Sequence, residues 1–211
     1  MICAIVLAAG RSQRMGRQKL LLRLGDKPVI AHVVDTLLHS KIIEQVFVVV
    51  GRDETRIRQS LKGRDVRFVT PGQTNDMLAS VRAAIRALPQ ACDAIFVALG
   101  DQPGLRVRLL KRMTAAFTTT RRSIIVPFYR GQYGHPLLFS ARYRKEILSR
   151  YDDTGLRGLR HAHPDEVCVV KTTVSAVLED LDTPADYRRQ LRRFSRTRRQ
   201  GASLRARHRG T

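Results

Sequence analysis

The 211-residue chain contains no tryptophan, only 6% aromatic residues and no acidic residue after Asp186. It also has no apolar run close to the roughly 20 residues that span a bilayer, so we expect no membrane association. Its three cysteines, Cys3, Cys92 and Cys168, are far apart and odd in number. Because this spacing suits neither a disulfide framework nor a metal-ligand set, we interpret them as reduced core residues of a cytoplasmic protein.

Basic residues greatly outnumber acidic ones, and they are unevenly distributed. The formal net charge is +21, and residues 188–211 hold ten arginines and no acid, which leaves +11 for the rest. A body this basic favours anionic ligands such as nucleotides, although solubility explains part of the charge. Residues 194–211 have few apolar side chains, so we expect a basic, disordered tail that binds nucleic acid at most weakly.

Apolar segments alternate with helical patterns through the first two thirds of the chain. Uninterrupted β-branched runs bounded by Gly, Pro or charge are typical of parallel strands covered on both faces. Such runs occupy residues 2–7, 46–50, 94–99 and 124–126. Between them, helical spacing of apolar residues predicts helices over residues 28–38, 77–88 and 105–117. The alternation predicts a right-handed α/β sheet.

The pattern changes beyond Pro127, where turn residues become frequent. We expect a hairpin or loop at residues 129–139, a short helix at 143–148, strands at 167–170 and 176–178, and a helix from Pro184 to about Arg193. This half should pack onto the first, giving one domain over residues 1–193. Ligands of open α/β sheets bind beyond the carboxyl ends of the strands, so loops starting at Ala8, Gly100 and Pro127 should line one crevice.

The loop after the first predicted strand has the composition of a phosphate site. Its sequence, from residue 7 to residue 19, is LAAGRSQRMGRQK. Small residues let backbone N–H groups approach phosphates, Gly10 and Gly16 permit unusual backbone angles, and the basic side chains can neutralise a triphosphate. The spacing is neither that of a Walker A loop nor that of the Rossmann glycines. From spacing alone, a glycine turn with solvated arginines is equally acceptable.

The same loop resembles the signature of the MobA-like nucleotidyltransferases, L-A-[AG]-G-x-S-x-R-M-G-x-x-K. Further segments are similar to the molybdenum cofactor cytidylyltransferase branch of that family: GDQP at residues 100–103, GHP at 134–136, TGLR at 154–157 and LEDLDTPADY at 178–187. The resemblance covers residues 2 to about 190. It implies a single-domain, Rossmann-like, three-layer α/β nucleotidyltransferase fold with a mostly parallel sheet.

Two carboxylates are candidates for a magnesium site. Asp101 follows the strand at residues 94–99, and Asp182 precedes Pro184 at the start of the last helix. Mg²⁺ prefers oxygen ligands and shares its coordination with phosphates. From the residues alone, Asp101 could be a turn residue and Asp182 a helix N-cap. The resemblance favours metal binding by both and implies Mg²⁺ as the cofactor.

The resemblance also implies roles for individual residues. The candidate catalytic residues are Arg14, Lys19 and Asp101. The candidate nucleotide-binding residues are Leu7, Ala8, Ala9, Gly10, Arg11, Arg14, Lys19, Ser80 and Asp101. His135 is the candidate acceptor-binding residue. The family often has glycine where this chain has Asp76, which leaves the geometry near Ser80 open.

Ala8 and Ala9 stand where the guanylyl branch commonly has Ala-Gly, so the resemblance implies CTP rather than GTP. The implied acceptor is the terminal phosphate of the molybdopterin cofactor, with release of pyrophosphate and a molybdenum hydroxylase as the recipient partner. A related transferase acting on a sugar phosphate or another small phosphate is an alternative. A nucleic-acid-binding module is another, but the chain has no tryptophan and no such motif.

Overall fold

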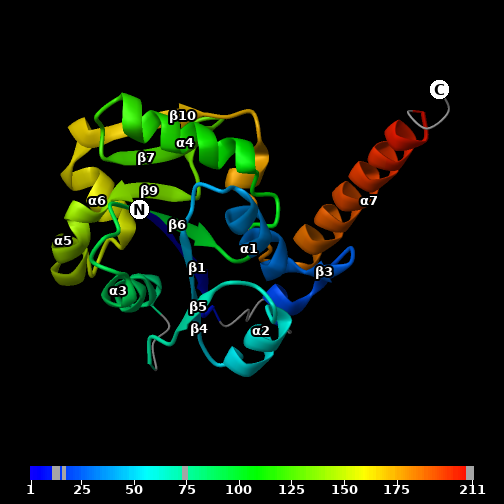
Figure 1. The fold of residues 1–211 in the computed structure, drawn as a ribbon, viewed down its shortest axis with the longest axis horizontal. Coiled ribbons are helices and arrows are strands. Elements are labelled where there is room, and N and C mark those ends of the chain that lie inside the picture. Colours follow the sequence, from blue (N-terminus) through cyan, green and yellow to red (C-terminus); the bar gives the residue numbers. More distant parts are fainter. Residues whose placement is uncertain (11–14, 16–17, 73–75, 208–211) are drawn as a thin grey trace.

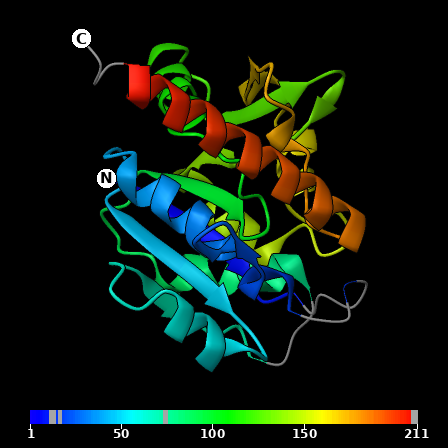
Figure 2. The same cartoon turned by 90° about the vertical axis from the view of Figure 1, so that its right-hand side faces the viewer.

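A central mixed sheet runs through the protein, with helices on both of its faces (Figures 1 and 2). The structure is a computed structural model that describes residues 1–10, 15, 18–72 and 76–207, with side chains up to residue 195. The strands follow the order β10-β7-β9-β6-β1-β4-β5, and β8 pairs with β7. Only β8 and β9 run antiparallel to their described neighbours, so the sheet is mostly parallel.

The elements have the following bounds. The strands of the main sheet are β1 Ile2–Ala8, β4 Gln45–Val50, β5 Arg67–Val69, β6 Ala94–Leu99, β7 Ile124–Tyr129, β8 Gln132–Tyr133, β9 Leu137–Ser140 and β10 Val167–Lys171. A small separate sheet contains β2 Arg23–Leu24 and β3 Lys27–Pro28. The α-helices are α1 Val29–His39, α2 Glu54–Ser60, α3 Met77–Ala87, α4 Val107–Thr119, α5 Arg144–Ser149, α6 Leu156–Ala162 and α7 Pro184–Arg207. The short 3₁₀ helices are η2 Lys19–Leu21, η3 Ala141–Tyr143, η4 Pro164–Glu166 and η5 Ser175–Val177.

Side-chain alternation along the strands divides the core into two layers. In β1, Ala4 and Val6 belong to the cluster that packs with α1, α2 and α4, whereas Cys3 and Ile5 belong to the cluster that packs with α3, α5 and α6. This is the period-two pattern of a strand buried on both faces. The strands and helices predicted in the first two thirds of the chain are therefore confirmed. The short helices α2 and α6 were not predicted.

After Pro127, the predicted hairpin is confirmed, but one predicted strand is absent from its expected position. Arg130 and Gly131 connect β7 to β8 with positive φ angles of 45° and 85°. Residues 176–178 were expected to form a strand, but residues 175–177 form η5 instead. The carbonyl oxygen of Val177 accepts the N–H of His135 at 2.9 Å, so this segment is held by a loop contact rather than by strand pairing.

The last helix is longer than the sequence pattern indicated. We expected it to end near Arg193 with a disordered tail from residue 194, but α7 continues to Arg207 and extends away from the body (Figure 1). Residues 194–207 contain no proline and several good helix formers, and this composition favours continuation of the helix. Its first turns are anchored by Tyr187, Leu191 and Phe194, which pack against a small cluster built around Leu24. None of the described helices is both long and apolar enough to cross a membrane.

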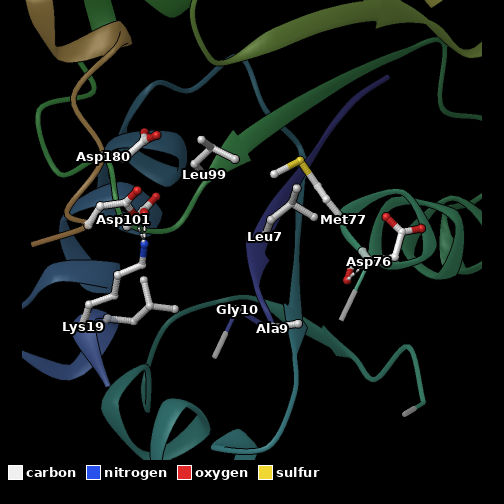
Figure 3. Close-up of a pocket in the computed structure, with 12 residues that line it drawn as sticks. Leu7, Ala9, Gly10, Lys19, Asp76, Met77, Leu99, Asp101 and Asp180 are labelled. Atoms are coloured by element: carbon white, nitrogen blue, oxygen red, sulfur yellow. Dashed lines mark hydrogen bonds and ion pairs between the residues drawn. The ribbon is translucent and has the colours of Figure 1, made fainter. Parts of the chain in front are cut away.

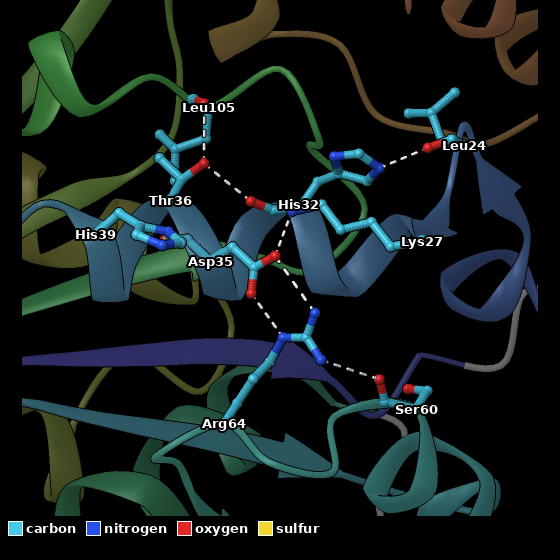
Figure 4. A network of polar contacts seen from close by, with 9 residues as sticks. All are labelled: Leu24, Lys27, His32, Asp35, Thr36, His39, Ser60, Arg64 and Leu105. Atoms are coloured by element: carbon cyan, nitrogen blue, oxygen red, sulfur yellow. Dashed lines mark hydrogen bonds and ion pairs between the residues drawn. The ribbon is translucent and has the colours of Figure 1, made fainter.

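An ion-pair network fixes α1 to the elements on either side of it (Figure 4). Asp35 accepts two hydrogen bonds from Arg64, from Nε at 2.6 Å and from a terminal nitrogen at 3.3 Å, and it also pairs with Lys27. Burial opposes ionisation of Asp35, but the hydrogen bonds from Arg64 and Lys27 outweigh it and lower the pKa of the carboxyl group. The network joins β3, α1 and the segment after α2.

Replacing Asp35 with asparagine should lower the free energy of unfolding at neutral pH by about 1–2 kcal/mol, because two cations lose a charged partner. A carboxylate with a lowered pKa stabilises the fold above its unfolded pKa, and that contribution is lost as the pH falls through the folded value. The difference between wild type and Asp35→Asn should therefore shrink below about pH 4. Urea unfolding measured over a pH series tests this.

The matched control is Asp65→Asn, at the exposed position that follows Arg64. It should leave the free energy of unfolding nearly unchanged at every pH. A pH-independent loss in Asp35→Asn would contradict the electrostatic explanation.

Candidate active site

A cavity of about 310 Å³ opens at the carboxyl ends of β1 and β6 (Figure 3). Its walls come from segments that are far apart in the sequence: the end of β1, η2, the start of α3, the loop after β6 and the segment before α7. The lining residues are Leu7, Ala9, Gly10, Lys19, Leu20, Asp76, Met77, Ser80, Leu99, Asp101, Asp180 and Asp182. Of the three loops expected to line one crevice, those starting at Ala8 and Gly100 line this cavity, whereas the loop after Pro127 lines a separate one.

A glycine brings the loop after β6 against β1. The N–H of Gly100 donates to the carbonyl oxygen of Leu7 at 3.0 Å. A Cβ at residue 100 would lie only 2.9 Å from that oxygen, so a larger residue would push the two segments apart. The close approach directs the next residue, Asp101, into the cavity, where the residue is only 8% exposed.

Lys19 joins the two predicted metal ligands. Its Nζ lies 2.5 Å from an oxygen of Asp101 and 2.9 Å from an oxygen of Asp182. Burial lowers the pKa of this ammonium group, but the two carboxylates outweigh burial, so the net pKa is raised. Lys19 therefore keeps its positive charge at neutral pH, and it lies where three segments that are distant in the sequence meet.

The structure separates the two interpretations of Asp182. The start of α7 is capped by Thr183, whose Oγ1 accepts the N–H of Asp186 at 3.2 Å, while the carboxylate of Asp186 accepts the N–H of Thr183 at 2.8 Å. This reciprocal pair is a capping box. The carboxylate of Asp182 instead contacts Lys19, so Asp182 belongs to the cavity wall.

The donor set suits a hard divalent cation that is shared with a phosphate. Asp101 and Asp182 bring carboxylate oxygens within 3 Å of the same nitrogen atom. Among the described residues, no group of three or more Asp, Glu, His or Cys side chains is arranged to hold a metal ion. Two protein carboxylates with substrate phosphates and water completing the shell are typical of Mg²⁺ sites.

The predicted nucleotide residues divide into three groups. Leu7, Ala9, Gly10, Lys19, Asp101 and Ser80 line the cavity. Ala8 is only 2% exposed and its side chain packs in the core, so only its backbone can serve a ligand. Arg11 and Arg14, like Gly16, lie outside the residues that the structure describes.

The start of α3 explains the unusual Asp76. Its carboxylate accepts the N–H groups of Leu78 and Ala79, so it is the N-cap of the helix. Ser80 donates from Oγ to the carbonyl oxygen of Asp76 at 3.2 Å and is 5% exposed. An aspartate at this position therefore stabilises the helix start while it lines the cavity.

Asp180 and Gln102 belong to the site although sequence reasoning assigned them no role. Gln102 Nε2 donates to a carboxylate oxygen of Asp180 at 2.8 Å. Burial, together with the charge of Asp101, raises the pKa of the Asp180 carboxyl group. Both residues lie within the motif segments already recognised, at residues 100–103 and 178–187, but no local pattern indicated that they pair.

Asp180 also lines a second cavity of about 480 Å³, which contains His135, Arg157 and Arg160. Arg160 lies over the ring of Tyr133, 4.0 Å from its centroid. Burial lowers the pKa of His135 to about 4. Among the nearby charges, that of Asp101 opposes this shift, whereas those of Arg160 and Arg157 add to it. His135 is therefore neutral at physiological pH, and the net positive charge of this cavity comes from the arginines.

The first cavity thus lies at the carboxyl edge of a mostly parallel sheet and contains two carboxylates bridged by a lysine. Residues 4–167 match the model of the MobA-like NTP transferase domain, so the chain belongs to the MobA-like NTP transferase family. A probable molybdenum cofactor guanylyltransferase of Thermococcus sibiricus is 26% identical over 144 residues, 68% of this chain and 69% of that protein.

Solved structures share the whole fold. A nucleotidyl transferase from Methanothermobacter thermautotroptrophicus is similar with a TM-score of 0.79 and 27% identity, covering 93% of this chain and 99% of that one. Rv0371C of Mycobacterium tuberculosis H37Rv, solved in complex with manganese, is similar with a TM-score of 0.74 and 29% identity, covering 90% and 97%. The predicted family and fold are thus confirmed.

Asp182→Asn should lower the rate of nucleotidyl transfer by about 100-fold or more, because a preorganised charge in the cavity is lost. Its neighbour supplies the control: Thr183→Ala should lower stability by about 1 kcal/mol through loss of the cap, with turnover close to wild type. Pyrophosphate release and thermal melting, measured on both variants, separate the two effects. Near-normal turnover in Asp182→Asn with a lowered melting temperature would limit Asp182 to a structural role through its contact with Lys19.

Proposed function

We propose that this nucleotidyltransferase transfers the cytidylyl group of CTP to the terminal phosphate of the molybdopterin cofactor, with Mg²⁺ as its cofactor. A molybdenum hydroxylase would be the recipient of the product. The observation that carries the proposal is the pair of ion pairs from Lys19 to Asp101 and Asp182 in the first cavity. The first cavity is rich in carboxylates, and the second cavity beside it contains arginines. A two-substrate transfer needs two such adjacent sites.

The nucleotide would occupy the cavity at the end of β1. Ala9 lines this cavity and packs against Gly51, where an added Cβ would lie 3.0 Å from the carbonyl oxygen of Ala9. The alanine methyl group takes space that a glycine would leave open. We infer that this methyl group favours the smaller pyrimidine base over a purine.

The acceptor would occupy the second cavity. Arg157 and Arg160 supply charge for a phosphate, and guanidinium groups bind phosphate in a bidentate manner. The neutral imidazole of His135 can donate or accept a hydrogen bond without repelling the arginines. Asp180 lines both cavities, so an acceptor phosphate bound near it would face the nucleotide.

The reaction needs positioning rather than covalent chemistry by the protein. An oxygen of the acceptor phosphate would form a bond to the α-phosphorus, and the bond from that phosphorus to the bridging oxygen would break, so that pyrophosphate leaves with the electron pair. Lys19, and Arg14 by prediction, would neutralise the triphosphate. A divalent ion held by Asp101 and Asp182 would supply charge stabilisation at the phosphates.

With molybdopterin cofactor and Mg²⁺, CTP should release pyrophosphate faster than GTP, ATP or UTP. Ala9→Gly should shift the ratio of kcat/KM for CTP and GTP by about tenfold toward GTP, because one methyl group in a pocket is worth that much discrimination. Ala8→Gly is the control, since the Ala8 side chain lies in the core and not in the cavity. It should leave the ratio unchanged.

A clear preference of the wild type for GTP would overturn the cytidylyl assignment, in line with the name of the Thermococcus sibiricus relative. Reaction with a sugar phosphate but not with molybdopterin would replace the proposed acceptor. Either result would leave the nucleotidyltransferase class intact.

Arg157→Gln should raise the KM for the acceptor by about tenfold or more, because a charged hydrogen bond to phosphate is lost. The KM for CTP should change little, since Arg157 lines the second cavity and not the first. Steady-state kinetics with each substrate varied in turn provides the measurement, and the exposed Arg122→Gln is the charge-matched control. An equal rise in both KM values would contradict separate substrate cavities.

A further inference from the structure

A third cavity of about 310 Å³ lies behind η5, next to the proposed acceptor cavity. It is bounded by the start of α4 on one side and by the segment that follows β10 on the other. Its floor is apolar and includes Leu109, Ala176 and Val177, all of them buried. Val174, which is 38% exposed, forms part of the mouth.

Three arginines of α4 and its N-cap surround this apolar floor. They are Arg106, Arg108 and Arg112, and none of the described residues that line the cavity is acidic. Arg112 donates to the carbonyl oxygen of Lys171 at 2.8 Å, which fixes it across the gap between α4 and β10. The first turn of α4 contains no acidic residue, so the positive end of the helix dipole adds to the arginine charge.

Cavities of this size with mostly apolar walls and a few convergent polar groups are typical small-molecule sites. A bare inorganic anion would leave the apolar floor uncovered, and a neutral apolar molecule would make no use of the charge of Arg106 and Arg108. We propose that this cavity binds a small organic anion, a carboxylate or phosphate ester carried on an apolar ring or short chain.

The wall between this cavity and the acceptor cavity forms where η5 meets the loop before β9. His135 and Val177 line both cavities. The segment is tightly held, because a Cβ at Gly104 would lie 2.5 Å from Ala176 and one at Gly134 would lie 2.3 Å from the carbonyl oxygen of Val177. An anion seated against η5 therefore contacts the segment that leads directly to Asp180 and Asp182.

The test uses 2-naphthoate, a carboxylate on an apolar ring system, titrated into the full-length protein and followed by amide chemical shifts. We expect saturable shifts at Val174 and Ala176, together with shifts at Val177 and His135 across the wall. Ser80, which lines the proposed nucleotide cavity, should not shift. The assay requires no enzymatic turnover, so it stands apart from the proposed reaction.

Arg106→Gln/Arg108→Gln should weaken binding of 2-naphthoate by about tenfold or more, because two charged partners are removed from exposed positions. Lys111→Gln/Arg122→Gln removes the same charge from exposed positions outside the cavity and should leave the dissociation constant within about twofold. Val174→Glu introduces a like charge at the mouth and should also weaken binding.

Equal affinity of both double variants would overturn the site, as would shifts confined to Ser80 and its neighbours. Absence of saturable shifts up to the solubility limit would overturn it as well. Equally tight binding of neutral 2-naphthol would show that the arginines take no part, which contradicts the proposed anion.

Discussion

The contact of the Lys19 ammonium group with the carboxylates of Asp101 and Asp182 is the interaction on which the site depends. It joins Lys19 to residues that lie 82 and 163 positions further along the chain. The side chains of Lys19 and Asp101 are largely buried, so their charges are stabilised chiefly by this contact. The ligand cavity, the start of α7 and the loop after β6 are arranged around this contact.

Close packing around two glycines makes the contact possible. Gly100 lets the loop after β6 lie against the end of β1, and Gly134 lets the loop before β9 lie against η5. Neither position has room for a Cβ. The chain continues from η5 directly to Asp180 and Asp182. The packing of this short segment therefore affects the nucleotide cavity, the acceptor cavity and the third cavity behind η5 together.

The division of charge between the cavities follows from their walls. Carboxylates gather with one lysine where β1 and β6 end, whereas arginines of α6 and α4 face the other two cavities. Burial keeps His135 neutral beside those arginines. Such a division separates a site suited to a cation and its phosphates from sites suited to anions.

The sequence by itself determined the strands and helices that carry long apolar patterns, the family, and the segments that meet at the site. Hydrophobic period and motif spacing are local properties, so β1, β6 and α3 could be predicted within a residue or two. Only the tertiary structure decided that Asp182 faces Lys19 while Thr183 caps α7, because both roles suit the same short motif. It also decided that Gln102 pairs with Asp180, that residues 175–177 form a 3₁₀ helix rather than a strand, and that a third cavity lies behind this helix. These features depend on contacts between segments distant in the chain, which no local pattern specifies.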